Sequence, residues 1–280
     1  MEKDKITFYD IERFINTMQC EEKSQATTEK YKRDLVSFLR YLDGRPLSKD
    51  IIISYKAYLQ QRYAVASANS MLAALNSFLR FLERQDLCVK QFRVQKKSFC
   101  DASEELTREE YLRLVHTAEN KKNKRLSLLL QTICATGIRV SELCYITLDA
   151  VKRGRASVTL KGKTRIVFIP SALQKKLLKY AKHQRIFGGA LFLTQGGKVV
   201  NRSHIWRQMK SLCQEAGVCA SKVFPHNLRH LFARTFYSIE KDIAKLADIL
   251  GHSSINTTRI YIVTTGEEHI KRLERMHLVT

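Results

Sequence analysis

Apolar side chains recur at helical spacing throughout the first third of the chain. They lie three or four positions apart in four segments, with polar breaks between them, and none of the four shows the period of two that a half-buried strand requires. The pattern predicts four short helices, at 8–18, 31–42, 51–59 and 71–82, packed as a small bundle. Taken by itself, this part of the chain is typical of any helical adaptor domain.

The helical spacing stops after residue 90. Residues 91–105 show no periodicity and carry three basic side chains, so we expect a linker that can follow a charged backbone. Helical spacing then returns. The sequence therefore predicts two domains, a helical bundle over residues 1–90 and a second domain over residues 106–280.

The second domain opens with clear helix signals. Thr107 and Glu110 have the spacing of a capping box. Residues 126–136 are apolar nearly all round, which predicts a helix buried at the centre of the domain. Gly137 ends that helix. Arg139 then stands at the junction with a following short helix, which is a rigid place from which to present a side chain.

Strand patterns occur next. Residues 157–160 and 165–169 are rich in β-branched and apolar side chains, and they flank a lysine-rich turn that contains Gly162. They predict a β-hairpin, which Pro170 ends. Helices are expected again over 171–187 and 201–215. The fold class predicted for the whole chain is mainly α with a small antiparallel β-sheet.

The most informative stretch is residues 224–263. Its first helix presents three polar side chains in just over one turn, namely His226, Arg229 and His230. A further helix ends at Gly251, so His252 is expected just beyond a helix end. Tyr261 follows on a short helix that Asn256 or a neighbouring threonine can cap. Residues 267–277 form an amphipathic tail.

These side chains suit a phosphate ester. The planar fork of Arg229 can bind two non-bridging oxygens. The imidazoles of His226 and His252 can donate hydrogen bonds or move protons near pH 7. Tyr261 is a candidate nucleophile, and surrounding cations would favour its deprotonated form.

Each residue also has a structural interpretation. A histidine pair four residues apart on a helix is more often structural, or else binds a metal. Because no third ligand of obvious type lies nearby, no metal site is predicted. Arg139 could simply form a surface salt bridge with Glu142.

Four motifs, taken in order, narrow the interpretation: TGIRVSEL, PHNLRH, LGHSS and TTRIY. In this order they resemble the tyrosine recombinases of the phage integrase family, closest in layout to the compact Xer-type enzymes. The resemblance implies cleavage and rejoining of DNA strands at specific sites through a 3′-phosphotyrosyl intermediate, without metal or other cofactor. It also implies that the first domain is a core-binding (SAM-like) domain and the second the catalytic integrase domain.

The resemblance assigns roles to single residues. Those with a catalytic role are Arg139, Lys163, His226, Arg229, His252 and Tyr261, with Glu142 and His230 in support. Tyr261 would be the nucleophile and His226 its base. Lys163 would protonate the leaving 5′ oxygen, and it is preferred over Lys161 because it follows Gly162 in the family manner. The hairpin loop is shorter than the common family pattern.

Composition supports a polyanionic partner. The net charge is +22, and the isoelectric point is near 9.8, which exceeds what solubility requires. A solvated basic surface or an RNA-binding protein would also fit the charge alone. The seven cysteines show no CxxC pairing and predict reduced thiols in a cytoplasmic protein. No apolar run is long enough to cross a membrane.

The resemblance also implies partners. We expect double-stranded DNA with a specific site and a homotetramer on that DNA, with or without a second recombinase, in which the tail docks into a neighbouring protomer. A role in a mobile element, in inversion or in chromosome dimer resolution fits equally. Two alternatives stay open: a type IB topoisomerase that relaxes DNA, and a DNA-binding protein of the same fold that does not cut.

Overall fold

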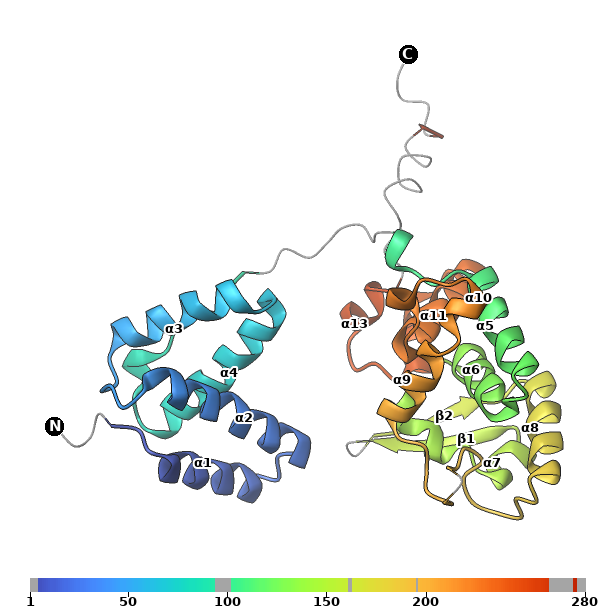
Figure 1. The fold of residues 1–280 in the computed structure, drawn as a ribbon, viewed down its shortest axis with the longest axis horizontal. Helices are drawn as coiled ribbons and strands as arrows, with labels where there is room; N and C mark the ends of the chain where they lie inside the picture. The colour runs from blue at the N-terminus through green and yellow to red at the C-terminus, as the bar shows by residue number, and fades with distance from the viewer. Residues whose placement is uncertain (1–4, 94–101, 161–162, 195, 262–273, 276–280) are drawn as a thin grey trace. The chain divides into compact units, whose positions relative to one another are not determined.

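Helices dominate the computed structural model, which describes residues 5–93, 102–160, 163–194, 196–261 and 274–275 (Figure 1). The only sheet among these residues has two antiparallel strands, which confirms the predicted fold class. The chain separates into two compact units, residues 1–96 and residues 97–280. No helix in the described ranges is long and apolar enough to span a bilayer.

The first unit is a bundle of the four helices that the hydrophobic spacing predicts. They are α1 (Phe8–Cys20), α2 (Gln25–Leu42), α3 (Lys49–Arg62) and α4 (Val65–Phe81). The side chains of Thr7, Ser24 and Ser48 cap the first three. Phe78 of α4 packs on Phe14 of α1 within the unit's own buried core. The bundle therefore has its own hydrophobic core.

The second unit has the following elements besides the short 3-10 helices η3 (Ala102–Glu104) and η5 (Ala220–Lys222): α5 (Arg108–Asn120), α6 (Lys124–Thr136), the 3-10 helix η4 (Val140–Tyr145), α7 (Leu148–Lys152), β1 (Arg155–Leu160), β2 (Lys163–Phe168), α8 (Ser171–His183), α9 (Arg202–Lys210), α10 (Cys213–Ala216), α11 (Pro225–Glu240), α12 (Ile243–Leu250) and α13 (Ile255–Arg259). The capping box of Thr107 and Glu110 is present at the start of α5, as predicted.

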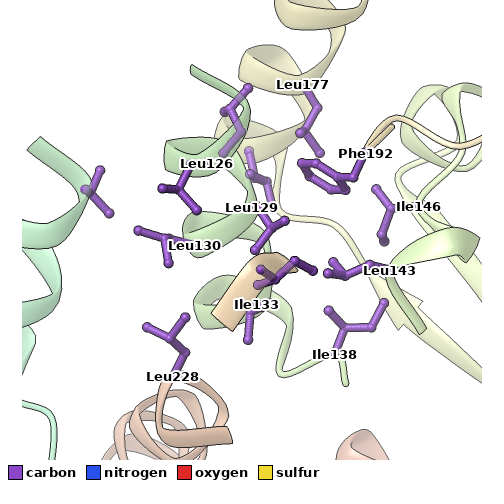
Figure 2. Packing of buried hydrophobic residues seen from close by; sticks show 14 of the residues in the cluster. Leu126, Leu129, Leu130, Ile133, Ile138, Leu143, Ile146, Leu177, Phe192 and Leu228 are labelled. Atoms are coloured by element: carbon purple, nitrogen blue, oxygen red, sulfur yellow. The ribbon is translucent and has the colours of Figure 1, made fainter. Parts of the chain in front are cut away.

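The central helix of this unit is α6, in agreement with its all-round apolar sequence. It packs against α5, α8, α9 and α11. Figure 2 shows Leu129 and Ile133 of α6 among side chains from the surrounding elements, including Phe192 and Leu228. Burial on every side makes α6 the support on which the ends of the neighbouring segments are fixed.

The hairpin is longer at its turn end than the sequence predicts. The observed register pairs Leu160 with Lys163, so only residues 161 and 162 separate the strands, and the expected four-residue loop is wrong. Thr159 and Thr164 face each other with their hydroxyl oxygens 2.9 Å apart. This cross-strand contact extends the pairing beyond the β-branched run that the sequence indicated.

The single helix expected over residues 201–215 was wrong. Residues 201–215 form two helices because a tighter turn separates them. The Leu212 N–H donates to the carbonyl of Met209, three residues back rather than four. The short helix expected after Arg139 is present as a 3-10 helix. The tail helix expected over residues 267–277 lies outside the described residues apart from 274–275.

Gly137 ends α6 in the left-handed conformation, as expected, with φ +63°. A Cβ atom here would lie 2.5 Å from the Phe232 ring and 3.1 Å from Leu250. The glycine therefore serves two purposes: it turns the chain toward Arg139, and it lets α11 and α12 approach the end of α6.

We expect Gly137→Ala to lower the free energy of unfolding by about 3 kcal/mol, from the strained backbone and the overpacked contact together. The matched control is Gly217→Ala, which has φ +60° and no atom within 4 Å of the added carbon. It should cost only the backbone strain, about 1 kcal/mol. Urea unfolding of both variants measures the difference, and equal losses would contradict the packing argument.

Candidate active site

Three arginines converge on the C-terminal end of α12. Arg165 donates to the carbonyl of Ile249, Arg229 to that of Leu250 at 2.7 Å, and Arg139 to that of Gly251 at 3.4 Å. The last carbonyls of a helix have no partner within the helix and carry partial negative charge. Three consecutive carbonyls of the helix end thus each hold one guanidinium.

Arg229 is the most deeply buried of the three, with 1% of its surface exposed. It projects from α11 and also donates to the carbonyl of Gly137 at the end of α6. Its Nε has no hydrogen-bond partner among the described residues. Burial, followed by the charge of Arg139, lowers the pKa of Arg229 to about 10, so it stays charged at neutral pH.

Glu142 of η4 balances part of this charge. Its Oε1 accepts from Arg139 at 2.9 Å, and its Oε2 accepts from Arg165 at 2.6 Å and from the Arg139 backbone N–H at 2.9 Å. Burial opposes ionisation, but the Arg139 backbone hydrogen bond and the charge of Arg165 outweigh it and hold the pKa of Glu142 below its usual value. The salt bridge between Arg139 and Glu142 is therefore part of the site.

His252 follows α12 directly, beyond Gly251 as expected. Its Nε2 lies 3.0 Å from a guanidinium nitrogen of Arg229, and its Nδ1 lies 2.8 Å from the hydroxyl of Thr258. A guanidinium only donates, so Nε2 accepts and Nδ1–H donates to Thr258. Burial and the charge of Arg229 lower the pKa of His252 to about 4, so the ring is neutral at pH 7.

Tyr261 lies among three imidazole rings. The distances from its ring centre to the ring centres are 4.4 Å for His230, 5.6 Å for His252 and 5.8 Å for His226. Only 3% of Tyr261 is exposed, and its apolar neighbours come from α11 and α12. The short helix α13 ends at Arg259, just before Tyr261, and is capped by Ser254, so the expectation of Asn256 or a threonine as the cap was wrong.

The remaining two histidines are also biased toward the neutral form. Burial, and then the charge of Arg229, lowers the pKa of His226. Burial and the neighbouring His226 lower the pKa of His230 to about 4. A neutral imidazole beside a tyrosine is able to accept its proton, which the charged form cannot do.

The structure thus brings together seven of the residues singled out in the sequence: Arg139, Glu142, His226, Arg229, His230, His252 and Tyr261. Lys163 begins β2, but its side chain and the whole of Lys161 lie outside the described part of the chain. Among the described residues, no three histidine, cysteine, aspartate or glutamate side chains gather in a way that could hold a metal ion.

Sequence reasoning missed Arg165. A signal was present, because Arg165 shares the period of two with Val167 and Ile169, which are 3% and 5% exposed, whereas Ile166 and Phe168 between them point outward. A charged residue in register with the buried face of a strand predicts a buried partner of opposite charge.

Family comparisons cover both units of the chain. The Phage integrase family matches residues 104–268, and the Phage integrase N-terminal SAM-like domain matches residues 11–86. The chain is 30% identical to tyrosine recombinase XerA of Thermococcus kodakarensis, covering 96% of this chain and 95% of that protein. It is also 30% identical to tyrosine recombinase XerD of Pseudomonas aeruginosa, covering 90% and 91%.

Solved structures share the fold. XerH site-specific recombinase bound to difH substrate has a TM-score of 0.71 and 19% identity, over 95% of this chain and 84% of that one. A lambda integrase dimer bound to a COC′ core site has a TM-score of 0.73 and 19% identity, over 93% and 78%. With both units and all four motifs accounted for, the chain belongs to the phage integrase family and is a tyrosine recombinase homologous to the Xer enzymes.

Proposed function

We propose that the protein cleaves and rejoins DNA strands at specific sites, with Tyr261 as the nucleophile. One observation carries the proposal: the buried ring of Tyr261 lies beside His226, His230 and His252, while two arginines of the same site are fixed on the carbonyls next to His252. Nucleophile, proton acceptors and anion-binding groups are thus assembled in one place, which phosphoryl transfer requires.

The proposed reaction uses these groups together with Lys163. The Tyr261 oxygen forms a bond to phosphorus while the bond from phosphorus to the 5′ oxygen breaks. His226 accepts the phenol proton, and Lys163 gives a proton to the leaving 5′ oxygen. Arg139 and Arg229 donate to the non-bridging oxygens, whose charge grows in the transition state. His252 supports them by accepting a hydrogen bond from the Arg229 guanidinium. A 5′ hydroxyl from a second duplex then reverses the step, so the phosphoester energy is conserved and no cofactor is needed.

The substrate is double-stranded DNA. The net charge of +22 fits a polyanion, and related folds are known bound to DNA, among them a lambda integrase tetramer bound to a Holliday junction. We further propose that the protein assembles as a homotetramer on a specific DNA site, with or without a second recombinase. It would act in the cytoplasm, on a mobile element or on the chromosome. In the homotetramer, residues 91–105 link the two domains, and residues 267–277 dock into a neighbouring protomer. Because the relatives are recombinases, DNA relaxation of the type IB topoisomerase kind is not favoured.

Tyr261→Phe should abolish the covalent protein–DNA adduct on nicked duplexes that carry the target site, with a loss of at least about 10³-fold, because the attacking oxygen is gone. DNA affinity should change less than about twofold. Denaturing gels run with a metal chelator present measure the adduct. Tyr237→Phe, in the same apolar cluster, is the matched control and should form adduct normally. An adduct that persists in Tyr261→Phe would exclude Tyr261 as nucleophile.

The rate of adduct formation at limiting DNA should fall with acidity, with a midpoint below the ordinary histidine pKa of 6.5. The folded-state pKa of His226 is lowered, so its imidazole stays neutral and able to accept a proton below pH 6.5. This ability is lost only as the pH falls through the lowered pKa, where the ring becomes protonated. His226→Gln should slow the reaction about 10²-fold and remove this acid limb. If the acid limb of the pH–rate profile is unchanged in His226→Gln, the group that titrates is not His226.

Lys163→Ala should slow cleavage of ordinary DNA by about 10²-fold or more. A substrate in which sulfur replaces the leaving 5′ oxygen should restore the rate, because a thiolate leaves without a proton. Lys161→Ala, the matched control, should lose less than about fivefold on either substrate if it contacts only phosphate. The opposite pattern would assign the acid to Lys161.

A further inference from the structure

Arg165 connects three separate parts of the catalytic unit. It belongs to β2, its Nη2 lies 2.6 Å from the Glu142 carboxylate in η4, and its Nη1 donates to the carbonyl of Ile249 in α12. Its side chain is 14% exposed. A guanidinium is the one side chain able to hold two such acceptors at fixed directions.

The chain next to His252 is shaped around this side chain. Gly251 has φ +65°, and a Cβ atom there would lie 2.3 Å from Cδ of Arg165. Arg165 therefore occupies the space that a side chain at position 251 would need. The backbone that leads into His252 lies directly against an arginine that belongs to the hairpin.

Arg165 also shares the carboxylate of Glu142 with the catalytic Arg139. Glu142 is fully buried, and its two oxygens serve Arg139 on one side and Arg165 on the other. Glu142 thus ties the position of the hairpin to the position of Arg139. Without Arg165, β2 would lose its ion pair with η4 and its hydrogen bond to the end of α12.

Lys163 stands two residues before Arg165 on the same strand. The opposite face of β2 gives little anchorage, because Ile166 is 49% exposed and Phe168 is 70% exposed. The ion pair and hydrogen bond of Arg165 are therefore principal polar contacts between the hairpin and the site.

We propose that Arg165 is a positioning residue that holds the hairpin against the site, so that the hairpin lysine reaches the leaving 5′ oxygen. The inference rests on the proposed function. It makes Arg165 a requirement for protonation of the leaving group, whereas Arg139 and Arg229 act on the non-bridging oxygens.

The test compares Arg165→Met on two nicked duplexes at saturating concentration, one with the ordinary 5′ oxygen and one with sulfur in its place. We expect the variant to form adduct about 10²-fold more slowly than wild type on the oxygen substrate and within about threefold of wild type on the sulfur substrate. DNA affinity, measured by fluorescence anisotropy, should change less than about threefold. Recovery on sulfur also shows that the variant is folded.

Arg155→Met is the matched control, because Arg155 is an exposed arginine of β1 and its removal changes the net charge equally. It should react like wild type on both substrates. Arg165→Lys is the second variant. Its single ammonium cannot hold both acceptors as the fork does, so it should show the same dependence on the leaving group while it preserves the charge, and it serves if Arg165→Met does not fold.

Three possible results distinguish failure of the inference about Arg165 from failure of the proposed function. A folded Arg165 variant that matches wild type on the oxygen substrate would overturn the inference. One that is equally slow on both substrates would overturn it as well, because Arg165 would then act through Arg139 rather than through the hairpin. Absence of any adduct from wild type, on either substrate, would instead refute the proposed function.

Discussion

The carbonyl end of α12 is the feature on which the site depends. Three guanidiniums are held close together there, with one carboxylate, that of Glu142, between two of them. Like charges at this spacing repel, and burial makes the repulsion worse. Three successive helix carbonyls offset it, each through one hydrogen bond. The same few residues of chain, ending in Gly251, also place His252 within reach of Arg229.

Among the described residues, the site keeps a surplus of positive charge, because Glu142 is the one carboxylate that pairs with any of its three arginines. Arg229 retains an Nε donor without a partner among the described residues, and its pKa is lowered. In the proposed reaction, the DNA phosphate supplies the missing negative charge, and the transition state supplies more of it. Because the donors are fixed in advance by the backbone, they need little reorganisation when that charge develops.

The sequence predicted most of the architecture, since periodicity, caps and glycine stops are local signals. The helices of the first unit, the buried α6 and the stops at Gly137 and Gly251 were confirmed on such grounds. The register of Arg165 with the buried Val167 and Ile169 was an overlooked local signal, but its partners lie in η4 and α12, and a local pattern does not identify them. The cap of α13 was misassigned because serine, asparagine and threonine are all favourable N-cap residues, and only the backbone geometry selects Ser254.

The three hydrogen bonds from the arginines to the carbonyl end of α12 also determine when activity can appear. Two of these three hydrogen bonds join residues 84 and 112 positions apart, the third joins residues 21 apart, and the contact between Arg229 and Gly137 spans 92. Contacts of such high contact order form late, after the loops between them have closed. A chain still being synthesised, or one broken before α12, therefore contains the arginines but not their arrangement. A tyrosine recombinase thereby becomes competent only once its catalytic unit has folded to completion.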